Sequence, residues 1–238
     1  MSDLPIPFTA PMIRALLGEI EAPGTGKTQT RRLPKITWED GANAAFSGWR
    51  AERAGSRHWQ LIGGMGVGAN IKTPYAPGDR LWVKEHHVFD AQMDHLPASK
   101  LSQHEPRGYP ANNWLIEPAC SMIRAGRLRP PMFMPRWASR ITLIVTDVRI
   151  ERVQDISEAD AIAEGVEPYD GIDPYVSGYR WYGDGAEPGQ WLSSIGSFRT
   201  LWNSLHGPGA WDRNDWVAAF TFTVHHCNID AMPKEGGA

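Results

Sequence analysis

The sequence predicts an α+β fold in which a small β-barrel or curled sheet carries short helices. Three observations predict this class. The most strand-like segment, residues 140–156, is rich in β-branched residues and alternates between apolar and polar positions. The segments with helical spacing are short. Strands and helices also do not alternate with the βαβ rhythm of a doubly wound sheet. We see no internal repeat, and we expect a single domain over residues 1–238.

The expected amino-terminal elements are a short strand, a helix and a second strand. Residues 5–9 (PIPFT) predict an edge strand, because proline is tolerated at a sheet edge. In residues 10–20 apolar side chains recur at helical spacing, and Pro11 suits the first turn of a helix. The turn signal Pro77-Gly78-Asp79 precedes RLWVKEHHVF, whose alternation predicts a strand.

The expected carboxyl-terminal elements have recognisable end signals. Within residues 140–156 the alternation changes phase near Thr146-Asp147, which predicts a bulge or a turn between two strands. In SEADAIAEGV, Ser157 is a favourable helix N-cap and Gly165 a favourable C-cap. The last two expected elements are a helix over residues 195–205 and a strand over residues 215–226.

Three long segments show no regular pattern and are expected to be insertions. They are residues 33–76, 90–131 and 166–191. The first contains the run GGMGVGAN, which is typical of flexible loops. The domain is therefore expected to be a small core interrupted by three loop insertions.

The composition indicates a soluble protein of the cytoplasm. The formal net charge of −3 argues against a protein that depends on non-specific nucleic-acid binding, because such a protein needs a basic surface. Cys120 and Cys227 show neither metal-ligand spacing nor a disulfide framework, which fits a reducing compartment. The first residues lack a leader pattern, and no stretch approaches the roughly 18 apolar residues of a membrane span.

Residues 21–32 (EAPGTGKTQTRR) partly match a phosphate-binding loop. Gly26-Lys27-Thr28 fits the end of the G-x-x-x-x-G-K-[ST] motif. The first glycine of the motif falls on Glu21, however, and the segment follows a predicted helix where the motif requires a buried strand. Pro34 disfavours the helix that should come next. An NTPase is therefore the less favoured interpretation.

The same segment carries groups suited to catalysis. Lys27 and Thr30 are three residues apart, so in a helical turn they share one face and the amine reaches the hydroxyl. A threonine hydroxyl needs a base, and lysine can serve if desolvation or the neighbouring Arg31 and Arg32 lower its pKa. Glu85, at the end of RLWVKE, is the candidate carboxylate that holds the amine or donates a proton. The alternative is a solvated basic turn.

The histidines do not predict a metal site. His86-His87 and His225-His226 are adjacent pairs, and neighbours in a strand face opposite ways. No His-x-His or His-x-x-x-His spacing occurs with a supporting carboxylate. We therefore expect neither a metal nor another cofactor.

Four segments, in this order, resemble ASCH-domain proteins, and most closely the larger phage and bacterial members. They are PMIRALLGEIEAPGTGKTQTRR, PGDRLWVKE, MPRWASRITLIVTDVRIERVQDISEADAIAEGV and FRTLWNSLHGPGAWDRNDWVAAFTF. The resemblance implies a PUA-like β-barrel whose cleft contains the lysine of a Gly-x-Lys-x-x-x-x-Arg signature. Lys27 and Arg32 match this spacing, whereas Thr25 stands where the signature has glycine.

The resemblance also implies an activity. Some ASCH proteins are amidohydrolases of N4-acetylcytidine and related N4-acylated cytosine nucleosides. Their proposed machinery is a Lys, a Thr three residues later and a Glu on a barrel strand, which Lys27, Thr30 and Glu85 match. In this hypothesis Lys27 accepts the proton of Thr30, Thr30 attacks the acyl carbonyl, and Glu85 helps to protonate the leaving nitrogen. Backbone N–H groups of turn 24–28 hold the oxyanion. Attack by Lys27 itself stays open.

Aromatic and guanidinium planes are expected to bind the base and sugar of such a nucleoside. The candidates are Trp82, Phe133, Arg136 and Trp137 for the base, and Arg31 or Arg32 for a ribose or phosphate. Core packing is the alternative for Trp82 and for the Met-Phe-Met segment, and ordinary surface exposure for the two arginines.

An RNA-binding module, with or without ribonuclease activity, is the alternative function. Other ASCH proteins are proposed RNA binders, and one branch is reported to act as a nuclease. Such a module needs a basic stripe. Its candidates are Arg124, Arg127, Arg129, Arg136 and Arg140.

Overall fold

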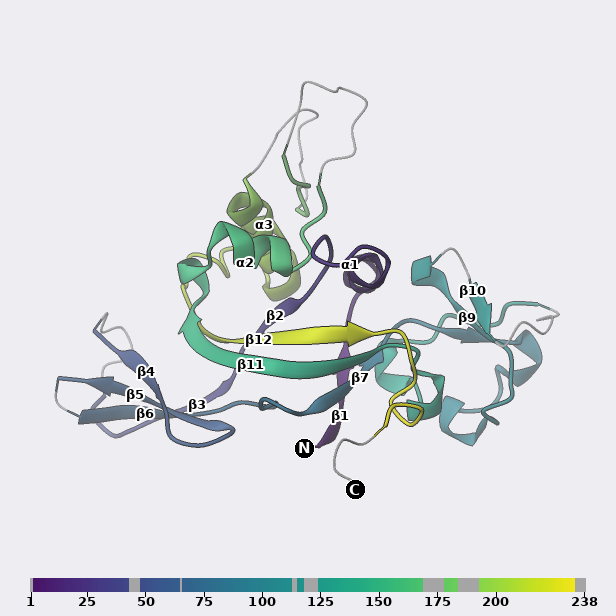
Figure 1. Cartoon of the computed structure of the whole chain (residues 1–238), viewed down its shortest axis with the longest axis horizontal. Helices are drawn as coiled ribbons and strands as arrows, with labels where there is room; N and C mark the ends of the chain where they lie inside the picture. The colour runs from purple at the N-terminus through teal and green to yellow at the C-terminus, as the bar shows by residue number, and fades with distance from the viewer. Residues whose placement is uncertain are drawn as a thin grey trace. The chain divides into compact units, whose positions relative to one another are not determined.

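The computed structural model of the chain contains two compact units, which are described one at a time (Figure 1). Unit 1 comprises residues 1–26, 78–144 and 223–238, and unit 2 comprises residues 27–77 and 145–222. The structure describes residues 2–42, 48–64, 66–112, 115–117, 124–168, 178–183 and 193–233. Cys120 and most of the predicted insertion 166–191 lie outside the described residues.

In unit 1, helix α1 accompanies strands from two sheets, of which the larger sheet is formed first along the chain. β1 (Asp3–Pro7) pairs in parallel with β7 (Arg80–Lys84), and β7 pairs antiparallel with the first residues of β11 (Thr142–Arg152). Helix α1 (Ala10–Glu21) buries one apolar stripe, made of Met12, Ile13, Leu16 and Leu17. The predicted edge strand, helix and second strand are confirmed.

The segment predicted as the second insertion forms a small sheet and single helical turns. The antiparallel strand order is β10 (Leu115–Glu117), β9 (Arg107–Tyr109), β8 (Val88–Phe89). The turns are η1 (Ala91–Met93), η2 (Ala98–Lys100), η3 (Pro110–Asn112) and η4 (Pro131–Phe133), and η5 (Arg136–Ala138) follows. Within the described part of this segment the elements are short, and the expectation of an insertion stays a prediction.

Unit 2 contains the other two helices. α2 (Glu158–Ala163) begins at Ser157, whose hydroxyl accepts a hydrogen bond from Asp160 N, and ends before Gly165, which has a φ of +82°. Both predicted end signals are therefore confirmed. α3 (Ser194–His206) contacts α2. The single turn η6 (Val153–Asp155) precedes α2 in the sequence. β2 (Gln29–Arg32) pairs antiparallel with β12 (Trp216–His225), so the predicted closing strand is also confirmed.

The segment predicted as the first loop insertion is a four-stranded sheet in unit 2. Its antiparallel order is β3 (Lys35–Trp38), β6 (Gly66–Lys72), β5 (His58–Gly63), β4 (Arg50–Arg53). Trp59, Leu61 and Ile71 are buried on one face, so this segment has its own apolar interior. The expectation of a loop over residues 33–76 is wrong, because the glycine-rich run belongs to the β5–β6 hairpin.

β11 is one uninterrupted strand of 11 residues. Thr146 and Asp147 are both exposed between the buried Val145 and Val148, so the alternation changes phase without a turn. The largest sheet has the order β1-β7-β11-β12-β2. Its edge strands, β1 and β2, are not paired with each other in the described chain. The α+β class is confirmed, but the sheet is open and does not form the predicted barrel.

Candidate functional site

The glycine-rich turn after α1 is occupied by a carboxylate from its own helix. Glu19 accepts hydrogen bonds from the N–H groups of Gly24 and Gly26, each at 3.0 Å. Thr25 N donates to the carbonyl of Ala22. A Cβ on Gly26 would lie 2.2 Å from Glu19 N, so only glycine fits against the helix. These donors are not available to a phosphate or an oxyanion, which contradicts both the phosphate-loop interpretation and the expected oxyanion site.

The residues after this turn are extended. Lys27 and Thr28 lead into β2, where Thr30 lies opposite Phe220 of β12. Side chains alternate along a strand, so Gln29 and Arg31 share one face and Thr30 lies on the other. The expectation that Lys27 and Thr30 share the face of a helical turn is therefore wrong. Pairing of β2 with β12 determines this extended conformation, and the local sequence of residues 27–32 does not show that distant partner.

The amine of Lys27 is buried and is held at the end of α2. Its Nζ donates to the carboxylate of Glu164 at 2.9 Å and to the carbonyl oxygen of the same residue at 2.5 Å. Thr28 N donates to the carbonyl of Ala163. Because the last carbonyls of a helix lack intrahelical partners, Lys27 and Thr28 complete the carboxyl-terminal end of α2. The Lys27 residue is only 1% exposed.

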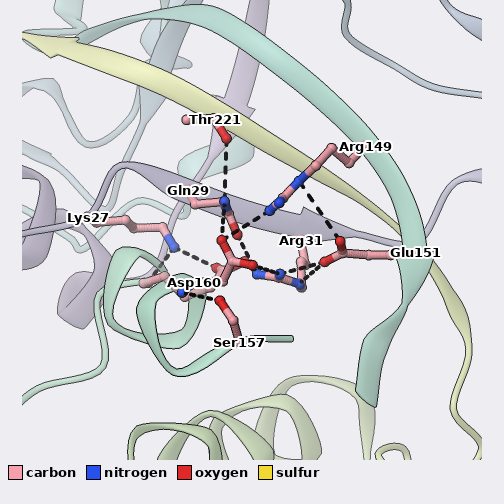
Figure 2. Close-up of polar contacts among 9 residues, drawn as sticks. Lys27, Gln29, Arg31, Arg149, Glu151, Ser157, Asp160 and Thr221 are labelled. Carbon is pink, nitrogen blue, oxygen red and sulfur yellow. Dashed lines mark hydrogen bonds and ion pairs between the residues drawn. The ribbon is translucent and has the colours of Figure 1, made fainter. Parts of the chain in front are cut away.

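Glu164 also binds Arg31, which is the centre of a buried polar cluster. The Nη1 of Arg31 donates to Glu164 Oε1 at 3.1 Å and to Gln29 at 2.6 Å, and its Nη2 donates to Glu151 at 2.5 Å. Figure 2 shows Lys27, Gln29 and Arg31 directed toward the acidic side chains of α2 and β11. The side chain of Arg31 has no exposed surface. Its guanidinium is therefore internal, which argues against Arg31 as the contact to a ribose or phosphate; the prediction for Arg32, which is half-buried, stays a prediction.

The surroundings change the proton affinity of two groups in this cluster. Burial lowers the pKa of Lys27, because the charged amine has lost its water. The negative charge of Glu164 opposes this effect, and the charges of Arg32 and Arg31 reinforce it. Burial raises the pKa of Asp160, but hydrogen bonds from Gln29 and Arg149, together with the charges of Arg149 and Arg31, outweigh burial and leave the pKa below its ordinary value.

Thr30 lies on the opposite face of β2 with aromatic neighbours. It is 4% exposed, and its hydroxyl makes no side-chain hydrogen bond within the described residues. Phe220, across from it, packs edge to face on Tyr75 at 5.3 Å between ring centroids. Burial raises the pKa of Tyr75 and lowers that of Arg32. The predicted hydrogen bond between Lys27 and Thr30 is therefore not formed in this structure.

Glu85 is buried in unit 1, where it binds Arg140. Both of its oxygens accept from the guanidinium of Arg140, at 2.9 and 3.0 Å, and Arg140 lies over the ring of Tyr109. Glu85 is 1% exposed. Because both oxygens of Glu85 accept from one guanidinium, this carboxylate acts as a hydrogen-bond acceptor in the pair. Its predicted role as a partner of Lys27, which belongs to unit 2, stays a prediction.

The side chains predicted to bind a base have different surroundings in unit 1. Phe133 is 60% exposed beside a hollow of about 370 Å³ that Arg127 also lines. Arg136 binds Asp3 and Asp230, whose hydrogen bonds raise the pKa of its guanidinium. Trp137 packs against Phe89, and Trp82 lies next to the amine of Lys84. Arg136 is therefore paired with two carboxylates of its own chain, and the predicted base contacts of these residues stay a prediction.

The predicted basic stripe is interrupted. Arg129 and Arg140 are buried, and Arg136 is neutralised by two carboxylates. Arg129 donates to the carbonyls of Leu96 and Met93. Only Arg124 and Arg127 of the five candidates are exposed. This finding weakens the alternative of a nucleic-acid surface at this position.

Sequence reasoning missed Glu164, Glu151 and Asp160. The segment SEADAIAEGV was interpreted only through its helix signals, although two of the three acids lie on it. An i, i+4 spacing of Asp160 and Glu164 places both acids on one helix face, which was the available signal. The proximity of Asp160 and Glu164 to the segment of Lys27 depends on strand pairing, which cannot be inferred from a single sequence.

No family model, curated protein or solved structure matches the chain. Within the described residues, no group of three or more His, Cys, Asp and Glu side chains is arranged to hold a metal ion. None of the helices in this part of the chain combines the length and the apolar character needed to cross a membrane.

Proposed function

We propose that the protein is a hydrolase that cleaves the N4-acyl amide of N4-acetylcytidine and related cytosine nucleosides, with Lys27 as the reactive amine. The resemblance to ASCH proteins motivates the reaction class and a PUA-like relationship of the fold, and the composition motivates a cytoplasmic location. One observation supports the choice of residue: the amine of Lys27 is buried, and its burial lowers its pKa. A lower pKa makes the neutral amine, which is the form that accepts a proton, easier to reach than in an ordinary surface lysine.

In the proposed reaction the hydroxyl of Thr30 attacks the acyl carbon while its proton passes to Lys27. The bond from carbon to N4 then breaks, and the ammonium of Lys27 returns the proton to the leaving nitrogen. Water attacks the acyl-threonine, gives one proton to the threonine oxygen and releases the carboxylic acid. Each step conserves atoms and protons without a cofactor.

This reaction requires the amine to leave its resting partner. Lys27 donates to Glu164 in the structure, and the hydroxyl of Thr30 makes no side-chain hydrogen bond within the described residues. Catalytic hydrogen bonds are often absent before the substrate binds. We therefore assign Glu164 the role of holding Lys27 between turnovers. Glu85 is paired with Arg140 in unit 1, and its predicted help in protonating the leaving nitrogen is not needed to balance these steps.

The test is the release of cytidine from N4-acetylcytidine by the purified protein, followed by chromatography. We expect Lys27→Ala and Thr30→Ala to abolish release and Thr30→Ser to retain it, because serine keeps the hydroxyl. Lys100→Ala is the matched control, since Lys100 is an exposed lysine of η2 in unit 1. Mass spectrometry of the quenched reaction should detect an acyl group on residue 30.

Two results would overturn the proposal. The function is wrong if the wild-type protein releases no cytidine from a series of N4-acyl substrates. The assignment of the nucleophile is wrong if Thr30→Ala turns over at the wild-type rate, or if the acyl group is found on Lys27.

A further inference from the structure

A hollow in unit 1 is lined by the starts of two single helical turns, η2 and η4, and is here called the η2–η4 hollow. Its volume is about 370 Å³, which is within the range of small-molecule sites. At about 30 Å³ for each water molecule, it has room for about twelve waters. The hollow therefore suits a ligand with a small apolar body, because most of its lining is apolar. The apolar lining residues are Pro97, Ala98, Leu128, Pro130 and Phe133.

The walls of the η2–η4 hollow are held in place before any ligand binds. Pro97 and Pro130 precede η2 and η4 with φ angles of −68° and −61°, the value that the proline ring imposes. Proline also has no backbone N–H, so these two positions offer no hydrogen-bond donor. Leu128 and Phe133 line the hollow but are 55% and 60% exposed. A ligand with an apolar surface would remove part of this exposed area from water, which favours binding.

Arg127 supplies an available cation to the lining of the hollow. The residue is exposed, and its guanidinium makes no ion pair or hydrogen bond within the described residues; only its backbone N–H donates, to Asp94. A guanidinium presents parallel N–H groups that match the two oxygens of a carboxylate. The polar end of the ligand is therefore expected to be an anion of this shape.

Arg129 adds a second, buried positive charge to the lining. Its Nη1 and Nη2 donate to the carbonyls of Leu96 and Met93, and its Nε has no hydrogen-bond partner within the described residues. Burial lowers the pKa of this guanidinium, and the charge of Arg127 lowers it further, so the two cations are close enough to repel each other. Asp94, whose carboxylate is 3.8 Å from Nη2 of Arg129, raises the pKa in return. Two arginines and one aspartate thus leave one uncompensated positive charge at the hollow.

We propose that the η2–η4 hollow binds a small carboxylate with an apolar body, of the size of a medium-chain fatty acid. The carboxylate contacts the guanidinium of Arg127, and the hydrocarbon part lies against Leu128, Phe133 and the two prolines. One uncompensated charge favours a ligand with a single negative charge, since a more highly charged anion would also be repelled by Asp94. The concave, mostly apolar lining favours a small molecule over another protein surface.

The test is isothermal titration calorimetry of the full chain with octanoate. We expect saturable binding at one site. Arg127→Gln should weaken this binding by roughly tenfold to hundredfold, because a hydrogen bond between two charged groups is lost. Phe133→Ala should weaken it about tenfold, because less apolar surface is covered when the ligand binds. Octanol, which has no charge, and acetate, which has no apolar body, should each bind at least about tenfold more weakly than octanoate.

Two exposed neighbours provide matched control variants. Arg124→Gln removes the same charge as Arg127→Gln, and Met132→Ala removes an apolar side chain next to Phe133, but neither residue lines the hollow. Both controls should bind octanoate as the wild type does. The four variants change exposed side chains, so their melting temperatures without ligand should stay close to that of the wild type. Octanoate should raise the melting temperature of the wild type more than that of Arg127→Gln, because only a bound ligand stabilises the folded state.

The proposal is overturned if the wild type does not bind octanoate, or if Arg127→Gln and Arg124→Gln bind it equally well. Octanol binding as tightly as octanoate would reject the contact with a carboxylate, and acetate binding as tightly would reject the apolar body. The hollow contains neither Lys27 nor Thr30, so Arg127→Gln should release cytidine at the wild-type rate. A protein that releases no cytidine can still bind octanoate, and the failure of one proposal is therefore distinguishable from the failure of the other.

Discussion

Lys27 donates to both the carboxylate and the backbone carbonyl of Glu164, across 137 residues of sequence. The carboxylate of Glu164 also accepts from Arg31, so one acid at the end of α2 holds two cations from the segment that leads into β2. This arrangement fixes the position of the amine and the end of the helix together. It also makes the amine sensitive to any change in that single acid.

We expect Glu164→Ala to be strongly destabilising. Lys27 then loses its carboxylate in a buried position, and removal of one partner of a buried ion pair costs about 3–5 kcal/mol. Glu164→Gln, which keeps the size and one acceptor, should cost less. The measurement is the free energy of unfolding in urea. As a control, Glu52→Gln breaks an exposed pair with Arg50 and should change stability by less than about 1 kcal/mol. A cost for Glu164→Ala as small as that of the control would contradict the buried pair.

The proposed hydrolysis should become faster as pH rises, because only the neutral form of Lys27 accepts a proton. The midpoint should lie below the ordinary pKa of lysine, since burial disfavours the charged amine. Glu164→Gln removes the negative charge that raises the pKa of Lys27, so its midpoint should move to still lower pH. The measurement is cytidine release as a function of pH for both proteins. An upward shift in the variant would disprove the link between the two residues.

Stability in acid should depend on His87. This residue of unit 1 has no exposed surface, and burial lowers the pKa of its ring from 6.5 to about 4. Between these values the unfolded chain binds a proton that the folded chain does not, so stability present above pH 6.5 is lost as pH falls toward 4. The loss should approach about 3 kcal/mol, at about 1.4 kcal/mol for each pKa unit.

The measurement for His87 is urea unfolding at a series of pH values. His87→Gln should remove most of the acid dependence in this interval, whereas His58→Gln, at an exposed position, should leave it intact. If the wild type and His87→Gln show parallel profiles, another group causes the acid dependence.

Gly26→Ala should be destabilising by about 1–3 kcal/mol, the usual cost of forcing an extra group into a packed site. Its Cβ would lie 2.2 Å from Glu19 N and 2.3 Å from the carbonyl oxygen of Ala15, both backbone atoms of α1. Gly18 provides the matched comparison, because its Cβ would meet nothing within 4 Å. Gly18→Ala should stabilise the helix by about 0.5–1 kcal/mol. In thermal unfolding, the melting temperature should be lower than that of the wild type for Gly26→Ala and higher for Gly18→Ala.

Local patterns predicted the three helices and the strands β1, β7, β11 and β12. The apolar stripe of α1, the caps of α2 and the alternation of β12 are short-range features, and each produces the expected structure. The four-stranded sheet was missed because glycines within its β5–β6 hairpin have the composition of a loop. Lys35, Ile36, Thr37 and Trp38 do alternate between exposed and half-buried positions, so a strand signal was present in β3.

The candidate site was predicted in part. Lys27 was found from its spacing of three residues to Thr30 and from its resemblance, together with Arg32, to the ASCH signature. The acid that holds it was not found, because Glu164 reaches Lys27 only through the packing of α2 beside β2. Thr30 was assigned to the wrong face, since a helical turn and a strand place residues i and i+3 differently. Spacing can propose partners, but secondary structure decides which side chains meet.

The turn after α1 has a further consequence. Two of its N–H groups converge on the carboxylate of Glu19, in the manner of a backbone nest that binds an anion. The nest is filled by its own chain, which makes Glu19 an intramolecular substitute for a dissolved oxyanion. Loss of this one carboxylate, as in Glu19→Ala, would vacate the nest and give sulfate or phosphate from the solution a place to compete. The partial phosphate-loop motif thus forms an anion-binding turn whose anion is a side chain of the same protein and therefore cannot dissociate from it.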